Sequence, residues 1–302
     1  MSDNDTGGPG MKTPDAEREL MRLSVAIESL LVERNPRHMQ RARAALAPGY
    51  LLRAASALHD CCTGATGRAI LIGTGFPVTG TFETDGPAGA IALYDALARA
   101  GAEPVIACGP PLSEALADDY RVLALVARDL RSAEVEAKAQ LARLQPGAVL
   151  AIERPGLAAD GRYYNMRGQD ISDRCYFFDP YLTCASCPTI GIGDGGNEVG
   201  MGNLADTLAD MDISASVTRC SELVVADVSN WAAYGLLGIL GCLAGRDFLA
   251  ELTPLETLNY LSRLGSVDGV TGTNTLTEDG MPVSEGLAVI AHIRDLASGD
   301  SY

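Results

Sequence analysis

Short apolar runs alternate with helical stretches between about residues 68 and 230, and this alternation restricts the chain to the α/β class. In the first unit, Arg68–Gly73 has the pattern of a buried strand, a helix follows to about Ala100, and Pro104–Cys108 is the next strand. Such a βαβ unit implies a right-handed parallel crossover. We therefore expect a mainly parallel sheet with helices on both faces.

The same pattern continues toward the C-terminus. Further strands are expected at residues 121–126, 147–152, 189–192 and 222–228. Further helices are expected at residues 112–117, 132–144, 229–243, 253–264 and 284–297. Thr253 and Glu256 flank a proline in the manner of a capping box, and Asp85 is the expected N-cap of the helix that begins near Pro87.

The N-terminal part of the chain lies outside this alternation. Residues 1–16 are polar and rich in glycine and proline, which predicts a disordered tail. Residues 17–302 are expected to form one α/β domain, whose N-terminal helices cover residues 17–60. Within them, residues 17–33 carry apolar side chains at helical spacing, and a second helical region runs through about residues 36–59.

The apolar and cysteine content indicates the compartment. No signal peptide is visible, and the longest apolar stretch, Trp231–Ala244, is too short to span a bilayer and suits a buried helix. Eight cysteines without a secretory signal are typical of free thiols, so we expect a cytoplasmic protein. Cys184 and Cys187 form a lone C-x-x-C without the second pair or nearby histidines that a zinc site needs.

The charge of the chain limits its partners. A net charge of −16, from 23 basic and 39 acidic residues, disfavours nucleic acid and anionic membrane surfaces. A small anionic substrate that meets local arginines remains compatible with this charge, and a homo-oligomer is left open. With only three histidines in the chain, acid–base chemistry falls mainly to carboxylates, a metal-bound water or a cysteine.

Unusual loops follow the predicted strands, at Gly73–Pro77, Glu153–Gly156, Gly193–Glu198 and residues 227–230. Because the carboxyl ends of parallel strands meet at one edge of a sheet, where α/β proteins bind ligands, we expect one small-molecule site there. The first loop lacks both the G-x-G-x-x-G spacing and the Gly-Lys-Ser/Thr of a phosphate loop, so no nucleotide cofactor is expected.

The loop after the fifth strand carries Asp194, Asn197 and Glu198 among closely spaced glycines. These hard oxygen donors suit Mg²⁺, Mn²⁺ or Ca²⁺, and a tight turn with a solvated carboxylate is the alternative. Glu83 and Asp85 bring two more carboxylates to a helix N-terminus, where Asp85 could serve as a cap alone.

Two arginines in the other loops are suited to binding an anion. Arg154 and Arg167 could clamp a carboxylate or phosphate through the two parallel hydrogen bonds of a guanidinium group. The alternative is that they form structural ion pairs with Glu153 and Asp170. The residues alone leave both interpretations open.

Six segments together carry a family resemblance. They are 73–77 (GTGFP), 83–87 (ETDGP), 153–156 (ERPG), 164–172 (YNMRGQDIS), 189–202 (TIGIGDGGNEVGMG) and 229–236 (SNWAAYGL). In this order they resemble the signature blocks of the D-glutamate cyclase-like, C-terminal domain family, and GDGGNEVGMG is the most specific of them. In the animal members of that family a further N-terminal domain, similar to a hydro-lyase, precedes this one, where the present sequence has only the helical stretch.

The resemblance implies a lyase that converts D-glutamate to 5-oxo-D-proline with loss of water and without ATP. In that reaction the amine attacks an anionic carboxylate, which a divalent metal would neutralise, while an arginine would hold the other carboxylate. The candidate catalytic residues are Asp194, Glu198 and Glu153. The candidate metal ligands are Asp194, Glu198, Glu83 and Asp85. The candidate substrate-binding residues are Arg154, Arg167, Asn165, Asn197, Gly195, Gly196, Thr74 and Asn230.

Two other functions fit the same loops. One is a metal-dependent hydrolase or phosphatase of small phosphate esters, in which the arginines would hold phosphate and a metal-bound water would attack. The other is a small-molecule-binding protein without catalysis. Turnover of D-glutamate, release of phosphate, and binding without turnover distinguish the three.

Overall fold

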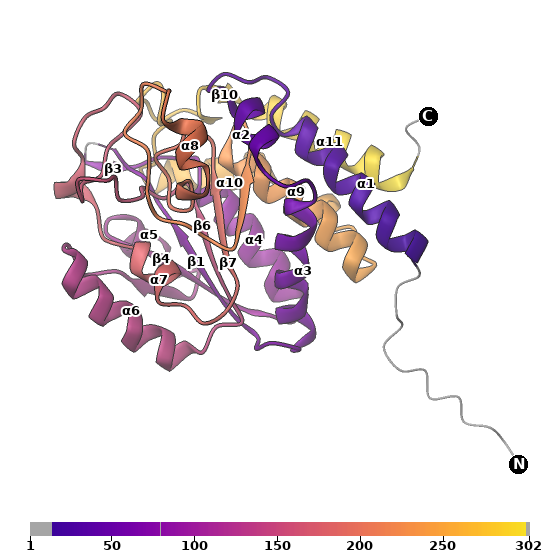
Figure 1. Ribbon diagram of the computed structural model, residues 1–302, viewed down its shortest axis with the longest axis horizontal. Coiled ribbons are helices and arrows are strands. Elements are labelled where there is room, and N and C mark those ends of the chain that lie inside the picture. The colour runs from indigo at the N-terminus through magenta and orange to yellow at the C-terminus, as the bar shows by residue number, and fades with distance from the viewer. Residues whose placement is uncertain (1–13, 79, 300–302) are drawn as a thin grey trace, which may run out of the picture.

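The computed structural model describes residues 14–78 and 80–299 of the chain. Within them a six-stranded, wholly parallel sheet has the order β5-β4-β1-β6-β7-β8 (Figure 1). The strands are β1 (Ala69–Thr74), β4 (Glu103–Cys108), β5 (Val122–Ala124), β6 (Ala148–Ile152), β7 (Thr189–Gly193) and β8 (Glu222–Val225). The predicted α/β class with a parallel sheet is confirmed.

The strand order places a crevice in the middle of the sheet. From β1 the chain moves outward through β4 to β5, returns to β6 on the other side of β1, and continues outward to β8. This is the order of doubly wound sheets, in which the connections diverge at the point where the direction reverses. Here that point lies between the carboxyl ends of β1 and β6, where Thr74 and Glu153 stand.

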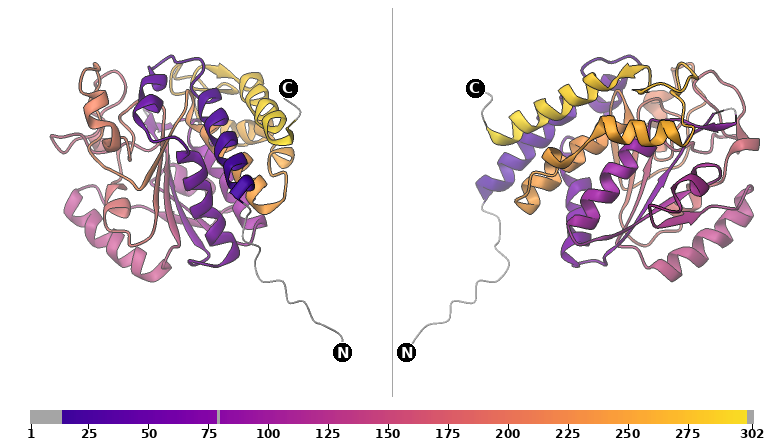
Figure 2. Two further views of the ribbon diagram at one scale, coloured as in Figure 1. Left: turned by 45° about the vertical axis from the view of Figure 1, so that its right-hand side comes forward. Right: turned by 180° about the vertical axis from the view of Figure 1, so that it is seen from behind.

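The central strands β1 and β6 contribute to two apolar cores because their side chains alternate in direction. Ile70 and Ile72 of β1 belong to the core on one face, and Leu71 belongs to the core on the other. The views in Figure 2 show these two helical layers. The first face is covered by α3 (Tyr50–Thr63), α4 (Pro87–Arg99) and α9 (Ser229–Ala244), and the second by α6 (Leu130–Leu144) and α7 (Asp179–Thr183).

The remaining elements lie around this framework. The other α-helices are α1 (Pro14–Leu30), α2 (Met39–Ala45), α5 (Leu112–Leu116), α8 (Ala205–Leu208), α10 (Pro254–Arg263) and α11 (Val283–Ser298). Short 3-10 turns occur at η1 (Ser172–Arg174), η2 (Gly202–Leu204) and η3 (Leu249–Glu251). Two small antiparallel hairpins pair β2 (Pro77–Val78) with β3 (Thr81–Phe82), and β9 (Thr277–Glu278) with β10 (Met281–Pro282).

Helix α9 is the predicted buried apolar helix, and α1, α3, α4 and α11 pack against it. Its residues from Ser229 to Gly241 are all buried. Across residues 14–78 and 80–299, no helix combines the length and the apolar character that crossing a bilayer requires.

The helical region predicted at about residues 36–59 is occupied by α2 and α3, and Gly49, with φ at 86°, lies just before α3. Two local predictions at the ends of helices are wrong. Helix α1 begins at Pro14, so the tail boundary at residue 16 is too late, and residues 1–13 lie outside the described residues. Thr253 precedes α10 but its side chain makes no capping hydrogen bond, so the expected capping box does not form.

A buried glutamate replaces the missing cap of α3. Gly49, at the N-cap position, has no side chain to accept hydrogen bonds from the first turn. Glu28 of α1 is 1% exposed, and its carboxylate accepts from Gly49 N at 3.2 Å and Leu51 N at 3.1 Å. Ser24 Oγ donates to the same carboxylate at 2.8 Å. The N-terminal helices are therefore attached to one another through one carboxylate.

Glu28→Ala should lower the free energy of unfolding by roughly 1–3 kcal/mol, because buried N–H groups of α3 would lose their acceptor. Glu33→Ala removes an exposed glutamate just beyond α1 and should change that free energy by less than about 0.5 kcal/mol. Chemical denaturation followed by circular dichroism measures both variants. Equal stabilities would contradict the capping role of Glu28.

Candidate functional site

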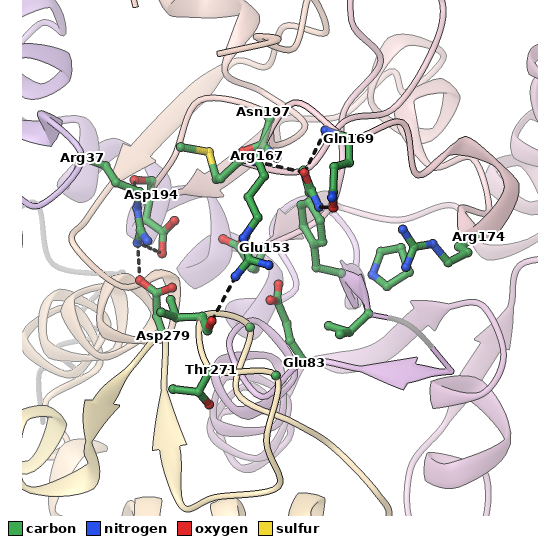
Figure 3. A pocket seen from close by; sticks show the side chains of 18 residues that line it. Arg37, Glu83, Glu153, Arg167, Gln169, Arg174, Asp194, Asn197, Thr271 and Asp279 are labelled. Carbon is green, nitrogen blue, oxygen red and sulfur yellow. Dashed lines mark hydrogen bonds and ion pairs between the residues drawn. The ribbon is translucent and has the colours of Figure 1, made fainter. Parts of the chain in front are cut away.

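A cavity of about 340 Å³ lies at the carboxyl edge of the sheet (Figure 3). The loops after β6 and β7 form one wall, and residues 269–272 with the β9–β10 turn form another. Its charged lining residues are Arg37, Glu83, Glu153, Arg167, Arg174, Asp194 and Asp279. In this lining, the predicted loop residues Glu153 and Asp194 lie together with Arg37, from the N-terminal helical region, and Asp279, from the β9–β10 turn.

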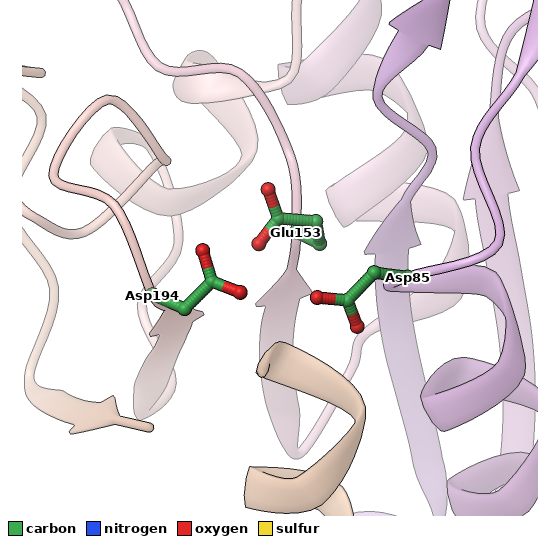
Figure 4. A group of neighbouring side chains, drawn as sticks. All are labelled: Asp85, Glu153 and Asp194. Carbon is green, nitrogen blue, oxygen red and sulfur yellow. The ribbon is translucent and has the colours of Figure 1, made fainter. Parts of the chain in front are cut away.

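Three carboxyl groups meet at the base of this site (Figure 4). Asp85 precedes α4, Glu153 follows β6 and Asp194 follows β7, and each offers one oxygen within 4.8 Å of the others. All three residues are buried. Carboxylates this close repel one another when all are ionised, so protons or a cation must stand among them.

Asp85 caps a helix other than the one it precedes. Gly86, with φ at 87°, is the N-cap residue of α4, and the Asp85 carboxylate turns toward α9. It accepts from Ser229 N at 3.0 Å and Asn230 N at 2.8 Å. The prediction that Asp85 is the N-cap residue of α4 is wrong, because Gly86 takes that position, and the Asp85 carboxylate reaches α4 only through Gly86 N at 2.9 Å.

Asn230 of α9 in turn caps helix α4. Its Oδ1 accepts from Gly86 N at 2.9 Å and Gly89 N at 2.7 Å, so the side chain at the start of α9 caps α4. Asn230 is completely buried and does not line the cavity. The polar atoms of Asn230 are engaged in the cap, and its predicted role in substrate binding stays a prediction.

Glu153 stands at the reversal point of the sheet in an unfavourable backbone conformation, with φ at 42°. Its Oε2 accepts from Ser229 Oγ at 2.6 Å. Burial raises the pKa of Glu153 well above its ordinary value, and the nearby Glu198, Asp85 and Glu83 raise it further. The uncharged, protonated form of Glu153 is therefore favoured more strongly than for a carboxyl group in water.

The pKa of Asp194 is also raised well above its ordinary value by burial, although the Arg37 guanidinium opposes this shift. Burial likewise raises the pKa of Asp85 to about 6, and the Asp85 and Asp194 carboxyls share a hydrogen bond. Three hard oxygen donors whose charged forms are disfavoured by burial fit a divalent cation, which would compensate their negative charge on binding.

Arg37 is the main residue of the site that the sequence did not indicate. Its Nη2 lies 2.9 Å from Asp194 Oδ2 and also contacts Asp279, and its Nε donates to the Asp194 backbone carbonyl at 2.9 Å. Asp227 fastens the segment before it, because its carboxylate accepts from Arg34 N and Asn35 N. The N-terminal helical region thus supplies a cation to the acidic group.

Glu83 lines the cavity but lies outside the group formed by Asp85, Glu153 and Asp194. Burial raises its pKa well above the ordinary value, and Asp85 adds to the shift. Among the described residues its carboxylate has no hydrogen-bond partner. A Cβ at Gly269 would lie 2.0 Å from Glu83 Oε2, so the facing loop needs glycine there.

Glu198 closes its own loop. Its two oxygens accept from Gly195 N at 2.8 Å and Gly196 N at 2.7 Å, and Glu198 is not a member of the acidic group. Gly195 and Gly196 were predicted to bind substrate, and their backbone N–H groups donate hydrogen bonds to Glu198. Asn197 lines the cavity and donates from Nδ2 to Tyr164 O at 2.8 Å, while its buried Oδ1 has no partner among the described residues.

The two predicted arginine clamps have different surroundings. Arg154 is 4% exposed, lies outside the cavity lining, and donates to the carbonyls of Thr74 at 3.2 Å, Gly75 at 2.7 Å and Tyr176. Within the described residues Arg154 forms no ion pair with Glu153, which corrects that interpretation, while its role as a substrate clamp stays a prediction. Thr74, also predicted to bind substrate, is completely buried and outside the lining.

Arg167 lines the cavity and is exposed, and its Nη2 donates to Val270 O across the opening at 3.2 Å. Asp170 pairs instead with Arg162 at 3.0 Å, so the structural ion pair considered for Arg167 does not form. Asn165 lines the cavity and shapes this loop, because its Oδ1 accepts from the backbone N–H groups of Arg167 and Gln169.

Comparison with known proteins adds an independent finding. The family described as "D-glutamate cyclase-like, C-terminal" matches residues 27–294. The human protein "D-glutamate cyclase, mitochondrial" is 32% identical over 219 residues, which are 62% of this chain and 35% of the human protein. The matched region therefore spans about a third of that relative's length.

Arg154→Ala should lower the free energy of unfolding by roughly 2–4 kcal/mol, because the carbonyls it binds would be left buried and unpaired. Arg167→Ala should change the same quantity by less than about 0.5 kcal/mol, because that side chain is exposed. Thermal and denaturant unfolding of the two variants tests the assignment. A stable Arg154→Ala protein would refute the structural role given to this residue.

Proposed function

This chain belongs to the D-glutamate cyclase-like, C-terminal family, and we propose that it converts D-glutamate to 5-oxo-D-proline with loss of water. The observation that carries the proposal is the cavity itself, which sets exposed Arg167 opposite the buried carboxyls of Glu83, Glu153 and Asp194. A ligand with an anionic end and a cationic end fits this polarity. Glutamate has a cationic ammonium group and two anionic carboxylates.

The chemistry of the cyclisation needs proton transfer but no net proton. The amine enters as an ammonium group and leaves as a lactam N–H, so it loses two protons. The γ-carboxylate loses one oxygen, which departs with those two protons as water. A single carboxyl group that takes a proton from nitrogen and gives it to oxygen therefore returns to its starting state after each turnover.

Glu83 is the residue best placed to carry these protons. It faces the cavity, lies outside the acidic group, and no described side chain occupies its carboxylate. Asn197 Oδ1, which is buried and unpartnered, is the acceptor for an N–H of the substrate amine. Contact of the nitrogen with these lining residues would convert binding into proximity.

The substrate α-carboxylate is assigned to Arg167. Its guanidinium makes one backbone contact at the cavity opening, and Arg174 lines the same cavity. A local cation is required, because the net charge of −16 repels an anionic substrate. Arg37 is less suited to this contact, since Asp194, Asp279 and two backbone carbonyls already engage it.

Asp85, Glu153 and Asp194 are the residues that would hold a divalent cation, with Mg²⁺ and Mn²⁺ the expected ions. When bound, such an ion supplies positive charge that makes the γ-carboxylate a better electrophile. Ser229 at the start of α9 and Arg37 orient the same carboxyls through the contacts described above. Glu198, proposed from the sequence as a ligand, supports this arrangement by holding the loop that carries Asp194.

Asp194→Asn should weaken Mn²⁺ binding by at least about tenfold, because it removes one of three clustered carboxylates. Titration of the purified protein with Mn²⁺, followed by electron paramagnetic resonance, measures this without reference to activity. Glu33→Gln removes one exposed charge outside the cavity lining and serves as the control. Equal affinities of both variants and the parent would remove the metal from the proposal.

Arg167→Ala should lower kcat/KM for 5-oxoproline formation from D-glutamate by about ten- to over a hundredfold, the loss of a charge-assisted hydrogen bond. Arg167→Lys should restore little, because an ammonium group cannot reproduce the planar guanidinium fork. Unchanged kinetics in both variants would reject the clamp. Absence of D-glutamate turnover by the parent protein with Mg²⁺ or Mn²⁺ present would reject the cyclase function itself.

A further inference from the structure

Glu278 of β9 is a completely buried glutamate that neither lines the cavity nor belongs to the acidic group. Its carboxylate accepts two hydrogen bonds from side chains in the first turn of α9. Asn230 Nδ2 donates to Oε2 at 2.8 Å, and Trp231 Nε1 donates to Oε1 at 3.1 Å. The Glu278 carboxylate therefore binds two side chains at the start of helix α9.

The neighbouring helix leaves space for this contact. A Cβ at Gly286 of α11 would lie 2.5 Å from Glu278 Oε1 and 3.2 Å from Trp231 Nε1. Any larger residue at position 286 would press on the hydrogen bond between those two groups. Helix α11 therefore packs closely against the hydrogen bond between Glu278 and Trp231.

The bond to Glu278 fixes which way the Asn230 amide points. With Nδ2 directed at Glu278, Oδ1 is directed at Gly86 N and Gly89 N, the start of α4. Asp85 stands directly before Gly86 and binds back to the backbone of α9. A continuous set of hydrogen bonds thus runs from Glu278 through Asn230 to one member of the acidic group.

We propose that Glu278 is a positioning residue for the reaction, which holds Asn230 and thereby sets the place of Asp85 against Glu153 and Asp194. This inference rests on the proposed function. The next residue extends the effect, because Asp279 contacts Arg37, and Arg37 contacts Asp194. The β9–β10 turn therefore reaches the acidic group from two directions.

Glu278→Gln tests the proposal with a change of almost no volume. Both partners of the carboxylate are donors, so the introduced amide must direct its own NH₂ at one of them. We expect kcat to fall about ten- to a hundredfold through misplacement of the carboxyls, with KM changed less than about threefold. KM is spared because Glu278 lies outside the cavity and away from Arg167.

A compensating variant separates positioning from simple loss of a side chain. Asn230→Asp alone sets an acceptor against the Glu278 carboxylate, and should lower kcat in the same way. Glu278→Gln combined with Asn230→Asp exchanges donor for acceptor at equal net charge. The introduced amide would then donate to the introduced carboxylate and accept from Trp231, so kcat should recover to within about threefold of the parent.

Glu28→Gln is the matched control. Glu28 is also a buried glutamate that accepts from two donors near a helix start, but it lies far from the cavity lining. That variant should lose stability and keep the parent kcat in its folded fraction. Equal loss of kcat in Glu28→Gln and Glu278→Gln, or a double variant no better than the worse single one, would overturn the proposal.

Hydrogen exchange provides a readout that does not require turnover. Backbone amides of Gly86, Gly89, Ser229 and Asn230 should exchange faster in Glu278→Gln than in the parent, and return to parent rates in the double variant. A parent protein that fails to turn over D-glutamate would reject the proposed function, while the exchange rates would still report on Glu278. Parent-like exchange in Glu278→Gln would reject the positioning role even in an active enzyme.

Discussion

The site depends on reciprocal capping of two buried helices, in which a side chain at the start of each helix accepts hydrogen bonds from the first backbone N–H groups of the other. Helices α4 and α9 pack side by side, and each begins with backbone N–H groups that have no partner within their own helix. Asp85, just before α4, accepts from α9, and Asn230, in α9, accepts from α4. Because water cannot replace these bonds in the interior, the two helices are held in one relative position. That position places a carboxylate at the reversal point of the sheet.

The electrostatics of the site follow from the same arrangement. Several carboxyls are buried close together, which would be unfavourable if all were ionised. The N-terminus of α9 faces Asp85, Glu153 and Asp194 through Ser229, and it carries partial positive charge. Arg37 adds a full charge. The remaining excess of negative charge can be balanced by shared protons or by a cation, which makes this part of the protein sensitive to what binds there.

Local sequence patterns predicted the sheet and the edge where the site lies, because strand periodicity and parallel geometry are short-range rules. They also brought Asp85, Glu153 and Asp194 to one place. Helix caps were harder, since the local rule for Asp85 considers only the helix that follows it. Arg37, Glu278 and Asp279 were missed for a stronger reason. Each acts on residues far away along the chain, and nothing beside it in the sequence marks that contact.

The cavity lining runs from Arg37 to Asp279, so the site draws on almost the whole described chain. Contacts between such distant segments carry a cost in chain entropy, because each requires a long loop to close. A partly folded molecule could contain the central strands and still have no binding cavity. The acidic group would then be open to water, with its carboxyls ionised at their ordinary pKa values. Chemical competence in this protein thus requires that segments as far apart as Arg37 and Asp279 are in place together.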